Sequence, residues 1–230
     1  MRALSLLPNL LTLGNLAAGS WAIALSYQRD WIGFALALST AMFCDWLDGG
    51  MARFLHAESS MGKELDALAD LVSFGLAPAF ALYNYLRPEI PLLPYDREVK
   101  FWMVMVPFIL PLLAAWRLAR FNAAPSSNLR FFVGLPTPAH GAFWGLWIIS
   151  APRDYWLHPV VWIGTILSVG LLMVSELPFF SLKSRQNVIW AAFTLALSAV
   201  GALYLPGANR VIFALAVYGV LSYVAARFYR

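Results

Sequence analysis

Four aspartates in an otherwise apolar part of the sequence are the residues whose type and spacing suggest chemistry. They lie in the stretch DWLDGGMARFLHAESSMGKELDALAD, at Asp45, Asp48, Asp66 and Asp70. Each flank of this stretch belongs to a long apolar segment. Carboxylates are costly inside such segments, and they mark a functional site by default.

The spacing of these carboxylates places them on two helix faces. Asp45 and Asp48 are three residues apart, which separates them by about 60° around a helix. Asp66 and Asp70 are four residues apart and share a face as well. Small residues continue both faces: Gly49 and Ala52 on the first, and Gly62, Ser73 and Ala77 on the second. Two such faces, opposed, would form a four-carboxylate cage with room for a large ligand.

An oxygen-rich cage of this kind suits the hard cations Mg²⁺ and Mn²⁺. Two metal ions about 3.5–4 Å apart, bridged by carboxylates, serve in-line displacement at phosphorus. We therefore expect two divalent metal ions, bound by all four aspartates. Alternatively, the aspartates cap helices or pair with Arg53 and Lys63. That interpretation suits one aspartate better than four in two helical pairs beside glycines.

The composition indicates an integral membrane protein. Of the 230 residues, 61% are hydrophobic and 12% are charged, and the N-terminal apolar run predicts a membrane helix and no cleaved signal peptide. The net charge of +4 fits basic loops near anionic lipid, so we expect no nucleic-acid partner. The single cysteine, Cys44, excludes an internal disulfide. We expect one transmembrane domain over residues 1–230, with the ten tryptophans facing lipid or its interface.

The apolar segments predict an all-α bundle of about eight transmembrane helices. The expected helices cover residues 6–27, 31–55, 62–86, 101–121, the apolar part of 131–150, 158–175, 188–205 and 209–228. Residues 87–100 contain three prolines and several charges, and they predict a loop. The second and third helices are then antiparallel neighbours, and both acidic pairs lie near one membrane face.

Charge bias predicts the orientation of the bundle. The N-terminus and the loops after even-numbered helices hold ten of the 16 lysines and arginines: Arg2, Arg53, Lys63, Arg117, Arg120, Arg130, Lys183, Arg185, Arg227 and Arg230. Because the more basic side faces the cytoplasm, we expect both termini and the acidic cage at the cytoplasmic face of the inner membrane. A nucleotide substrate would be available there.

The acidic motif resembles the signature of the CDP-alcohol phosphotransferases. The matching positions, at the family's spacing, are Asp45, Asp48, Gly49, Ala52, Arg53, Gly62, Asp66 and Asp70. The resemblance implies that Asp45, Asp48 and Asp66 bind metal. It also implies that Asp66 and Asp70 are catalytic, with Asp70 a metal ligand or neighbour and the general base.

The resemblance also implies a binding site for a CDP-linked lipid. Small residues would let the cytidine nucleotide approach the backbone, and Arg53 would bind the pyrophosphate, in agreement with the chemistry of these side chains. Asn9 and Thr12 belong to the family-like stretch PNLLTLGN and would help to hold the nucleotide. The implied set is Asn9, Thr12, Asp48, Gly49, Ala52, Arg53 and Gly62.

Three further stretches resemble the phosphatidylserine synthases of this family: KELDALADLVSFGLAPA, RLARFN and FFVGLPTPA. With the N-terminal stretch, the resemblance covers roughly residues 6–140. It implies a six-helix core plus two helices, a homodimer among membrane lipids, and the reaction of CDP-diacylglycerol with L-serine. Arg117 or Arg120 would bind the serine carboxylate, unless both only anchor their helix at the headgroups. The lone His140 is expected to be structural.

Two other functions remain open. The acceptor alcohol could be glycerol 3-phosphate or inositol phosphate, whose extra phosphate needs a basic cluster such as Arg117, Arg120 and Arg130. An ion transporter with an acidic path would explain intramembrane aspartates. It would leave the spacing of Gly49, Ala52, Arg53 and Gly62 unexplained.

Overall fold

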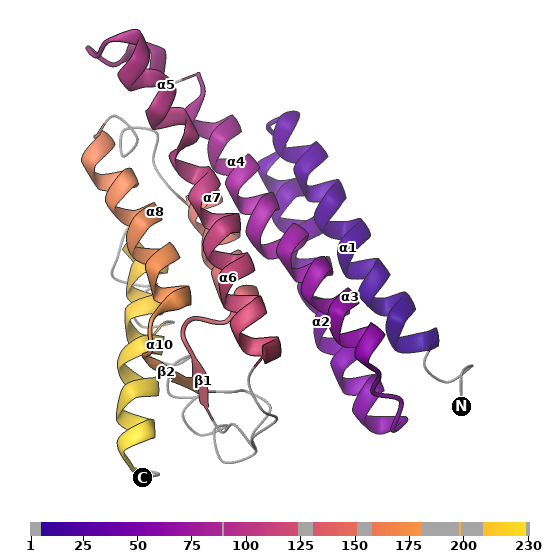
Figure 1. The fold of residues 1–230 in the computed structure, drawn as a ribbon. Coiled ribbons are helices and arrows are strands. Elements are labelled where there is room, and N and C mark those ends of the chain that lie inside the picture. Colours follow the sequence, from indigo (N-terminus) through magenta and orange to yellow (C-terminus); the bar gives the residue numbers. More distant parts are fainter. Residues whose placement is uncertain are drawn as a thin grey trace.

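The computed structural model describes residues 6–88, 90–123, 131–150, 158–180, 198 and 209–228, and these form a helical bundle (Figure 1). The elements are α1 (Leu6–Tyr27), α2 (Trp31–Phe54), α3 (Ser60–Asp70), the π-helical turn η1 (Leu71–Leu76), α4 (Ala77–Leu86), the 3₁₀ turn η2 (Ile90–Leu92), α5 (Arg97–Met105), the 3₁₀ turn η3 (Val106–Phe108), α6 (Ile109–Ala123), β1 (Phe131–Val133), α7 (Thr137–Ser150), α8 (Pro159–Val174), β2 (Pro178–Phe180) and α10 (Asn209–Phe228).

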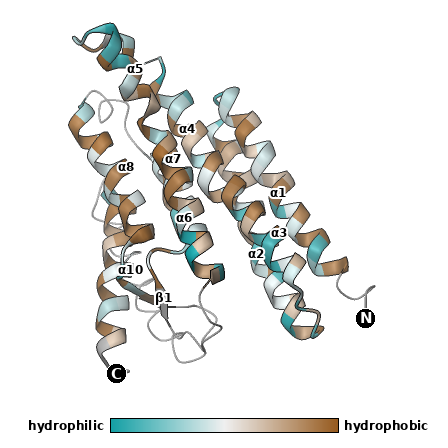
Figure 2. Cartoon of the chain, in the orientation of Figure 1, coloured by the Kyte–Doolittle hydropathy of each residue, from teal (hydrophilic) through white to brown (hydrophobic). Residues whose placement is uncertain are grey.

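Three continuous helices in the described ranges are long and apolar enough to cross a membrane, namely Leu6–Tyr27, Ser60–Leu86 and Arg97–Ala123. Helix α8 and the Val211–Ala226 part of α10 are apolar but shorter. Figure 2 shows hydrophobic residues along α6, α7 and α8, and hydrophilic ones on α5 and where α2 and α3 meet. The helical membrane bundle is confirmed, whereas the expected helix over 188–205 lies, apart from residue 198, outside the described residues.

Two details of the chain differ from the expectation. The loop expected over 87–100 ends early, because α5 begins at Arg97, where Glu98 in the first turn favours a helix N-terminus. The strands β1 and β2 form an antiparallel pair in which Phe131 faces Phe180, so the bundle is not purely α-helical. Each strand has three residues, too few for an alternating pattern to reveal it.

Buried aromatic rings form part of the core. The side chains of Trp144, Trp147 and Trp162 are fully buried, so the expectation that tryptophans face lipid or its interface is wrong for these three. Trp144 stacks edge-on against Phe143, with ring centroids 5.0 Å apart. Because α7 packs against α2, α4 and η1, the rings of Phe143, Trp144 and Trp147 on α7 form part of the support behind the acidic helices.

The helix that carries the second acidic pair contains the π-helical turn η1, in which the Ala77 N–H donates to the Val72 carbonyl. The Phe74 carbonyl of this turn accepts a hydrogen bond from His140 Nδ1 at 2.8 Å. Trp144 Nε1 donates to His140 Nε2 at 2.9 Å, so the His140 proton is on Nδ1 and the ring is neutral. His140 therefore supports the π-helical turn, as expected of a structural histidine.

Helix α1 runs beside the continuous helix α3–η1–α4 in close contact. The Ser73 hydroxyl donates to the Asn15 carbonyl at 3.0 Å, and Asn84 Nδ2 donates to Ser26 Oγ at 3.1 Å. Between these two bonds Gly19 lies against Ser73, and a Cβ at Gly19 would come within 2.6 Å of the Ser73 Cα. Small residues of this kind let membrane helices approach closely.

We expect Gly19→Ala to destabilise the protein by about 1–3 kcal/mol, because the added methyl group meets backbone that cannot move aside. Thermal unfolding in detergent measures the change. Gly164→Ala in α8 is the matched control, since a Cβ there meets nothing within 4 Å. Equal unfolding temperatures for the two variants would contradict the close contact at Gly19.

Candidate active site

The loop between α2 and α3 brings the two acidic pairs to one end of the bundle (Figure 1). One carboxylate oxygen from each of Asp45, Asp48 and Asp66 lies within 4.8 Å of the others. Asp48 is buried, whereas Asp45 and Asp66 are half-buried. Helix α3 begins after Ser59, whose hydroxyl accepts a hydrogen bond from the Gly62 N–H at 3.0 Å. This cap sets the start of the helix that carries Asp66.

The first turns of α1 lie against this group. Thr12 Oγ1 donates to Asp48 Oδ2 at 2.6 Å, with the Pro8 carbonyl as a longer alternative at 3.1 Å. A Cβ built at Gly62 would lie 3.2 Å from Asn9 Oδ1, so the Asn9 side chain reaches α3. The structure therefore places Asn9 and Thr12 beside the acidic residues.

Asp70 is buried beside the group of three and has two donors of its own. Asn15 Nδ2 donates to Asp70 Oδ1 at 3.2 Å, and Thr137 Oγ1 donates to Asp70 Oδ2 at 3.2 Å. The charges of Asp45 and Asp66 are close enough to act on the Asp70 carboxylate. Asp70 thus lies next to the group of three without belonging to it.

A buried arginine adjoins Asp70 through Thr137. Arg117 is 5% exposed, and its Nη1 donates to Thr137 Oγ1 at 3.2 Å. The hydroxyl of Thr137 thus accepts from Arg117 and donates to Asp70. Arg117 Nε is buried and has no hydrogen-bond partner among the described residues. One donor of this guanidinium is therefore unsatisfied by the described residues.

Arg120 is occupied differently. Its guanidinium donates to three backbone carbonyls near the strand pair, those of Val174 at 3.0 Å and of Val133 and Ser175 at 3.4 Å each. These bonds tie the end of α6 to β1 and to the chain at the end of α8. Arg120 is thus engaged in holding structure, which favours Arg117 over Arg120 as a ligand-binding residue.

The other residues expected at the site lie on the last turns of α2. Gly49 and Ala52 are half-buried, and Arg53 is exposed. Small residues allow a ligand to approach the backbone, and an exposed guanidinium is suited to bind phosphate. The Arg53 side chain makes no hydrogen bond to another described residue.

Two residues at the site escaped sequence interpretation. Asn15 carried only the signal that it is polar in an apolar helix, and Thr137 stands at the start of α7, 67 residues from Asp70. The available signal was a polar residue in the first half of one apolar segment and another at the start of a second one. Which carboxylate each of them contacts depends on how the helices pack.

The donor set fits hard divalent metal ions. The three grouped carboxylates offer oxygen only, the ligand type that Mg²⁺ and Mn²⁺ prefer. Asn15 Oδ1, adjacent to Asp70 through its own amide nitrogen, is buried and lacks a hydrogen-bond partner in the described part of the chain. The group of three is thus suited to hold a metal ion, and Asn15 adds a further oxygen nearby.

Comparison with known proteins places these features in a family context. The family model for CDP-alcohol phosphatidyltransferase matches residues 5–170. A CDP-diacylglycerol–serine O-phosphatidyltransferase of Methanocaldococcus jannaschii is 30% identical over 224 residues, 97% of each chain. The enzyme of that name from Bacillus subtilis is 30% identical, with 79% of this chain and 95% of the relative covered. The one from Mycobacterium leprae is 31% identical over 76% of this chain, which spans 58% of the length of that relative.

Proposed function

The chain belongs to the CDP-alcohol phosphatidyltransferase family, and we propose that it transfers the phosphatidyl group of CDP-diacylglycerol to the hydroxyl of L-serine, giving phosphatidylserine and CMP. The observation that carries this proposal is the arrangement of Asp45, Asp48 and Asp66 around one point, with Asp70 beside them. The relative from Methanocaldococcus jannaschii, matched over 97% of each chain, and the one from Bacillus subtilis, matched over 95% of its own length, carry the name of this activity.

Asp45, Asp48 and Asp66 would hold two divalent metal ions, Mg²⁺ or Mn²⁺, and Asp70 lies beside these three carboxylates. When bound, such ions neutralise the pyrophosphate and make CMP a better leaving group. The Thr12 hydroxyl fixes the rotamer of Asp48 through their 2.6 Å hydrogen bond. The site is thereby preorganised before the nucleotide arrives.

Asp70 is the general base. The serine oxygen forms a bond to the phosphatidyl phosphorus, the bond from that phosphorus to the CMP oxygen breaks, and the proton of the serine hydroxyl passes to the Asp70 carboxylate. Asn15 and Thr137 hold the two oxygens of Asp70 in place. Asp66 is close enough for its charge to act on Asp70, and it is the second catalytic carboxylate of this proposal.

Thr137→Val tests the positioning of Asp70, because it removes the hydroxyl and keeps the shape of the side chain. We expect the rate of CMP release to fall by up to about tenfold, the equivalent of one hydrogen bond. The Michaelis constant for CDP-diacylglycerol should stay the same. Thr165→Val in α8 is the matched control, since its hydroxyl bonds only its own helix, at the Val161 carbonyl. An unchanged rate of CMP release would show that the Thr137 hydroxyl does not position Asp70 for catalysis.

CDP-diacylglycerol binds at the α2–α3 end, where Gly49, Ala52 and Gly62 let the nucleotide approach and Asn9 and Thr12 line its path. The acyl chains extend into the membrane beside the helices. The exposed guanidinium of Arg53 binds the pyrophosphate.

Arg53→Ala is expected to raise the Michaelis constant for CDP-diacylglycerol by roughly ten- to a hundredfold, the loss of one charge-assisted hydrogen bond. The maximal rate should change much less. Steady-state CMP release measures both, and Arg97→Ala, at an equally exposed arginine of α5, serves as the control. An unaltered Michaelis constant would exclude the phosphate role of Arg53.

Arg117 is the serine-binding cation. Its buried Nε faces no partner in the described residues, and Thr137 links the same side chain to the base. A carboxylate is the natural complement of such a guanidinium. Serine bound there brings its hydroxyl next to Asp70. Arg120, bonded to backbone carbonyls, has a supporting role.

The same proposal includes the extent of the domain, its orientation in the membrane and its oligomeric state. One domain over residues 1–230 includes α10, which packs on β2 and α7 beyond the family match. The acidic end faces the cytoplasm in the inner membrane, in keeping with the positive-inside bias of the sequence. The active form is a homodimer, as the family resemblance implies.

The test is CMP release by detergent-purified protein with CDP-diacylglycerol and Mg²⁺ or Mn²⁺. L-serine, glycerol 3-phosphate and inositol phosphate are offered separately. We expect CMP release when L-serine is offered and no release with either of the other two acceptors. Release with glycerol 3-phosphate or inositol phosphate would keep the mechanism and replace the acceptor. No release from folded protein, together with ion flux in vesicles, would favour the transporter.

A further inference from the structure

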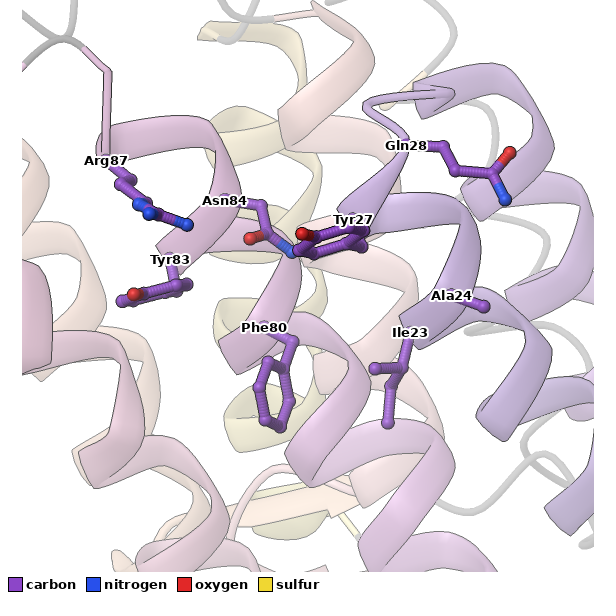
Figure 3. Close-up of a pocket in the computed structure, with 8 residues that line it drawn as sticks. All are labelled: Ile23, Ala24, Tyr27, Gln28, Phe80, Tyr83, Asn84 and Arg87. Carbon is purple, nitrogen blue, oxygen red and sulfur yellow. The ribbon is translucent and has the colours of Figure 1, made fainter.

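A pocket lies at the opposite end of α1 and α4 from the acidic residues. It has a volume of about 500 Å³ and is lined chiefly by Ile23, Tyr27, Phe80, Tyr83, Asn84 and Arg87 (Figure 3). A second hollow of about 410 Å³ shares Tyr27, Asn84 and Arg87, and extends to Arg29. The two hollows together form one surface, which we call the α1–α4 pocket.

The α1–α4 pocket is separate from the proposed active site. Tyr27 lies twelve residues beyond Asn15 along α1, about 18 Å at 1.5 Å per residue. Asn84 lies fourteen residues beyond Asp70, about 21 Å along its helix. A ligand in this pocket therefore has its polar group near the other membrane face, and the proposed reaction does not use it.

Contacts of the lining residues hold the elements around the pocket together. Asn84, buried at the base, donates to Ser26 Oγ at 3.1 Å and so links α4 to α1. Phe80 meets Phe108 edge-on, with ring centroids 5.2 Å apart, and Tyr83 lies 5.6 Å from the same ring. These contacts hold the α4 side of the pocket against η3. The hollow is thus bounded by packed elements on more than one side.

The lining changes from apolar to basic along the helices. Figure 3 shows Ile23 and Phe80 deeper along the helices, with Tyr27, Tyr83 and Arg87 toward the helix ends. Arg29 and Arg87 are both exposed there, and among the described residues no carboxylate lines either hollow. The nearby Asp30 is engaged at the start of α2, where it accepts from the Gly33 N–H at 2.9 Å.

This polarity fits an amphiphilic anion. Helices α1 and α4 belong to segments long enough to cross a membrane, and both segments end at the pocket. Tyrosines are common at the membrane interface, and guanidinium groups bind phosphate with two parallel hydrogen bonds. We propose that an anionic phospholipid binds in the α1–α4 pocket, with its phosphate at Arg29 and Arg87 and an acyl chain along Ile23 and Phe80.

Native mass spectrometry of the full chain tests this proposal, with phosphatidylglycerol and phosphatidylcholine offered in equal amounts. We expect the wild type to retain phosphatidylglycerol preferentially. The double variant Arg29→Gln/Arg87→Gln should lower that retention at least about tenfold, since it removes both phosphate-binding cations. Arg97→Gln, at an exposed arginine outside the pocket, is the control and should retain lipid like the wild type.

A second variant tests the acyl-chain part. Ile23→Trp fills the pocket and should reduce retention of phosphatidylglycerol, whereas Ile32→Trp adds the same volume at an exposed position of α2 and should not. Thermal unfolding checks that each variant is folded. Because retention is measured without substrate, its outcome is independent of the proposed reaction. Equal retention by wild type and double variant, or no preference for the anionic lipid, would overturn the proposal. If the wild type formed a dimer without lipid and Ile23→Trp disrupted that dimer, the proposal would also be overturned. The pocket would then be assigned to a second copy of the chain.

Discussion

Asp70→Asn is expected to slow CMP release by about a hundred- to ten-thousandfold, the usual contribution of a positioned general base. The amide has nearly the size of the carboxylate but cannot accept the proton of the acceptor hydroxyl. It also presents one oxygen where Asn15 and Thr137 now donate to two. CDP-diacylglycerol should still bind, because the group of Asp45, Asp48 and Asp66 is untouched.

Two measurements separate these effects: single-turnover CMP release for the chemical step, and equilibrium binding of CDP-diacylglycerol. Asp96→Asn is the matched control, because Asp96 precedes α5 and its side chain makes no capping hydrogen bond. Full activity in Asp70→Asn would show that another group accepts the proton. Loss of binding together with rate would instead make Asp70 part of the metal-binding set.

Asp48→Ala is expected to abolish the metal dependence of nucleotide binding, weakening CDP binding in Mn²⁺ by at least about a hundredfold, beyond the loss typical of residues that only support a metal ligand. Only two of the three grouped oxygens would remain. The Thr12 hydroxyl would lose its short bond and turn to the Pro8 carbonyl. Titration of CDP with and without Mn²⁺ measures the effect.

Thr12→Val provides a graded comparison for Asp48→Ala. It removes the hydrogen bond to Asp48 and leaves the carboxylate in place, so CDP binding should weaken by roughly ten- to a hundredfold, as for other supporting residues of metal sites. Asp96→Ala again tests the loss of a carboxylate elsewhere. Unchanged CDP affinity in Asp48→Ala, with metal present, would argue against a metal site at these aspartates.

The sequence was sufficient for much of the helix layout, because apolar run length and turn residues act locally. Residues 6–27 and 31–55 were expected as helices, and α1 and α2 cover Leu6–Tyr27 and Trp31–Phe54. Asp30 lies between them and caps α2 through the Gly33 N–H. The proximity of Asp45, Asp48 and Asp66 followed from helical spacing and a short antiparallel connection.

Contacts between distant segments could not be predicted in this way. Thr137 reaches Asp70 only because α7 packs against η1. Arg120 finds its carbonyl partners beside a strand pair whose three-residue strands give no periodic signal. Arg117 and Arg120, equivalent as charges in the sequence, are therefore distinguished only by their surroundings in the folded chain.

The π-helical turn constrains how this chain can change over evolution. Asp70 and Asn84 lie on either side of η1, and both contact α1, through Asn15 and Ser26. The π-helical turn is wider than an α-helical turn, so it sets how the Asn84 half of the helix is rotated relative to the Asp70 half. A change in the number of residues in this turn would therefore act on both contacts with α1. Within the stretch, Ser73 is itself constrained, because its hydroxyl donates to the Asn15 carbonyl of α1. Both the length of Leu71–Leu76 and the identity of Ser73 therefore limit how this helix can vary.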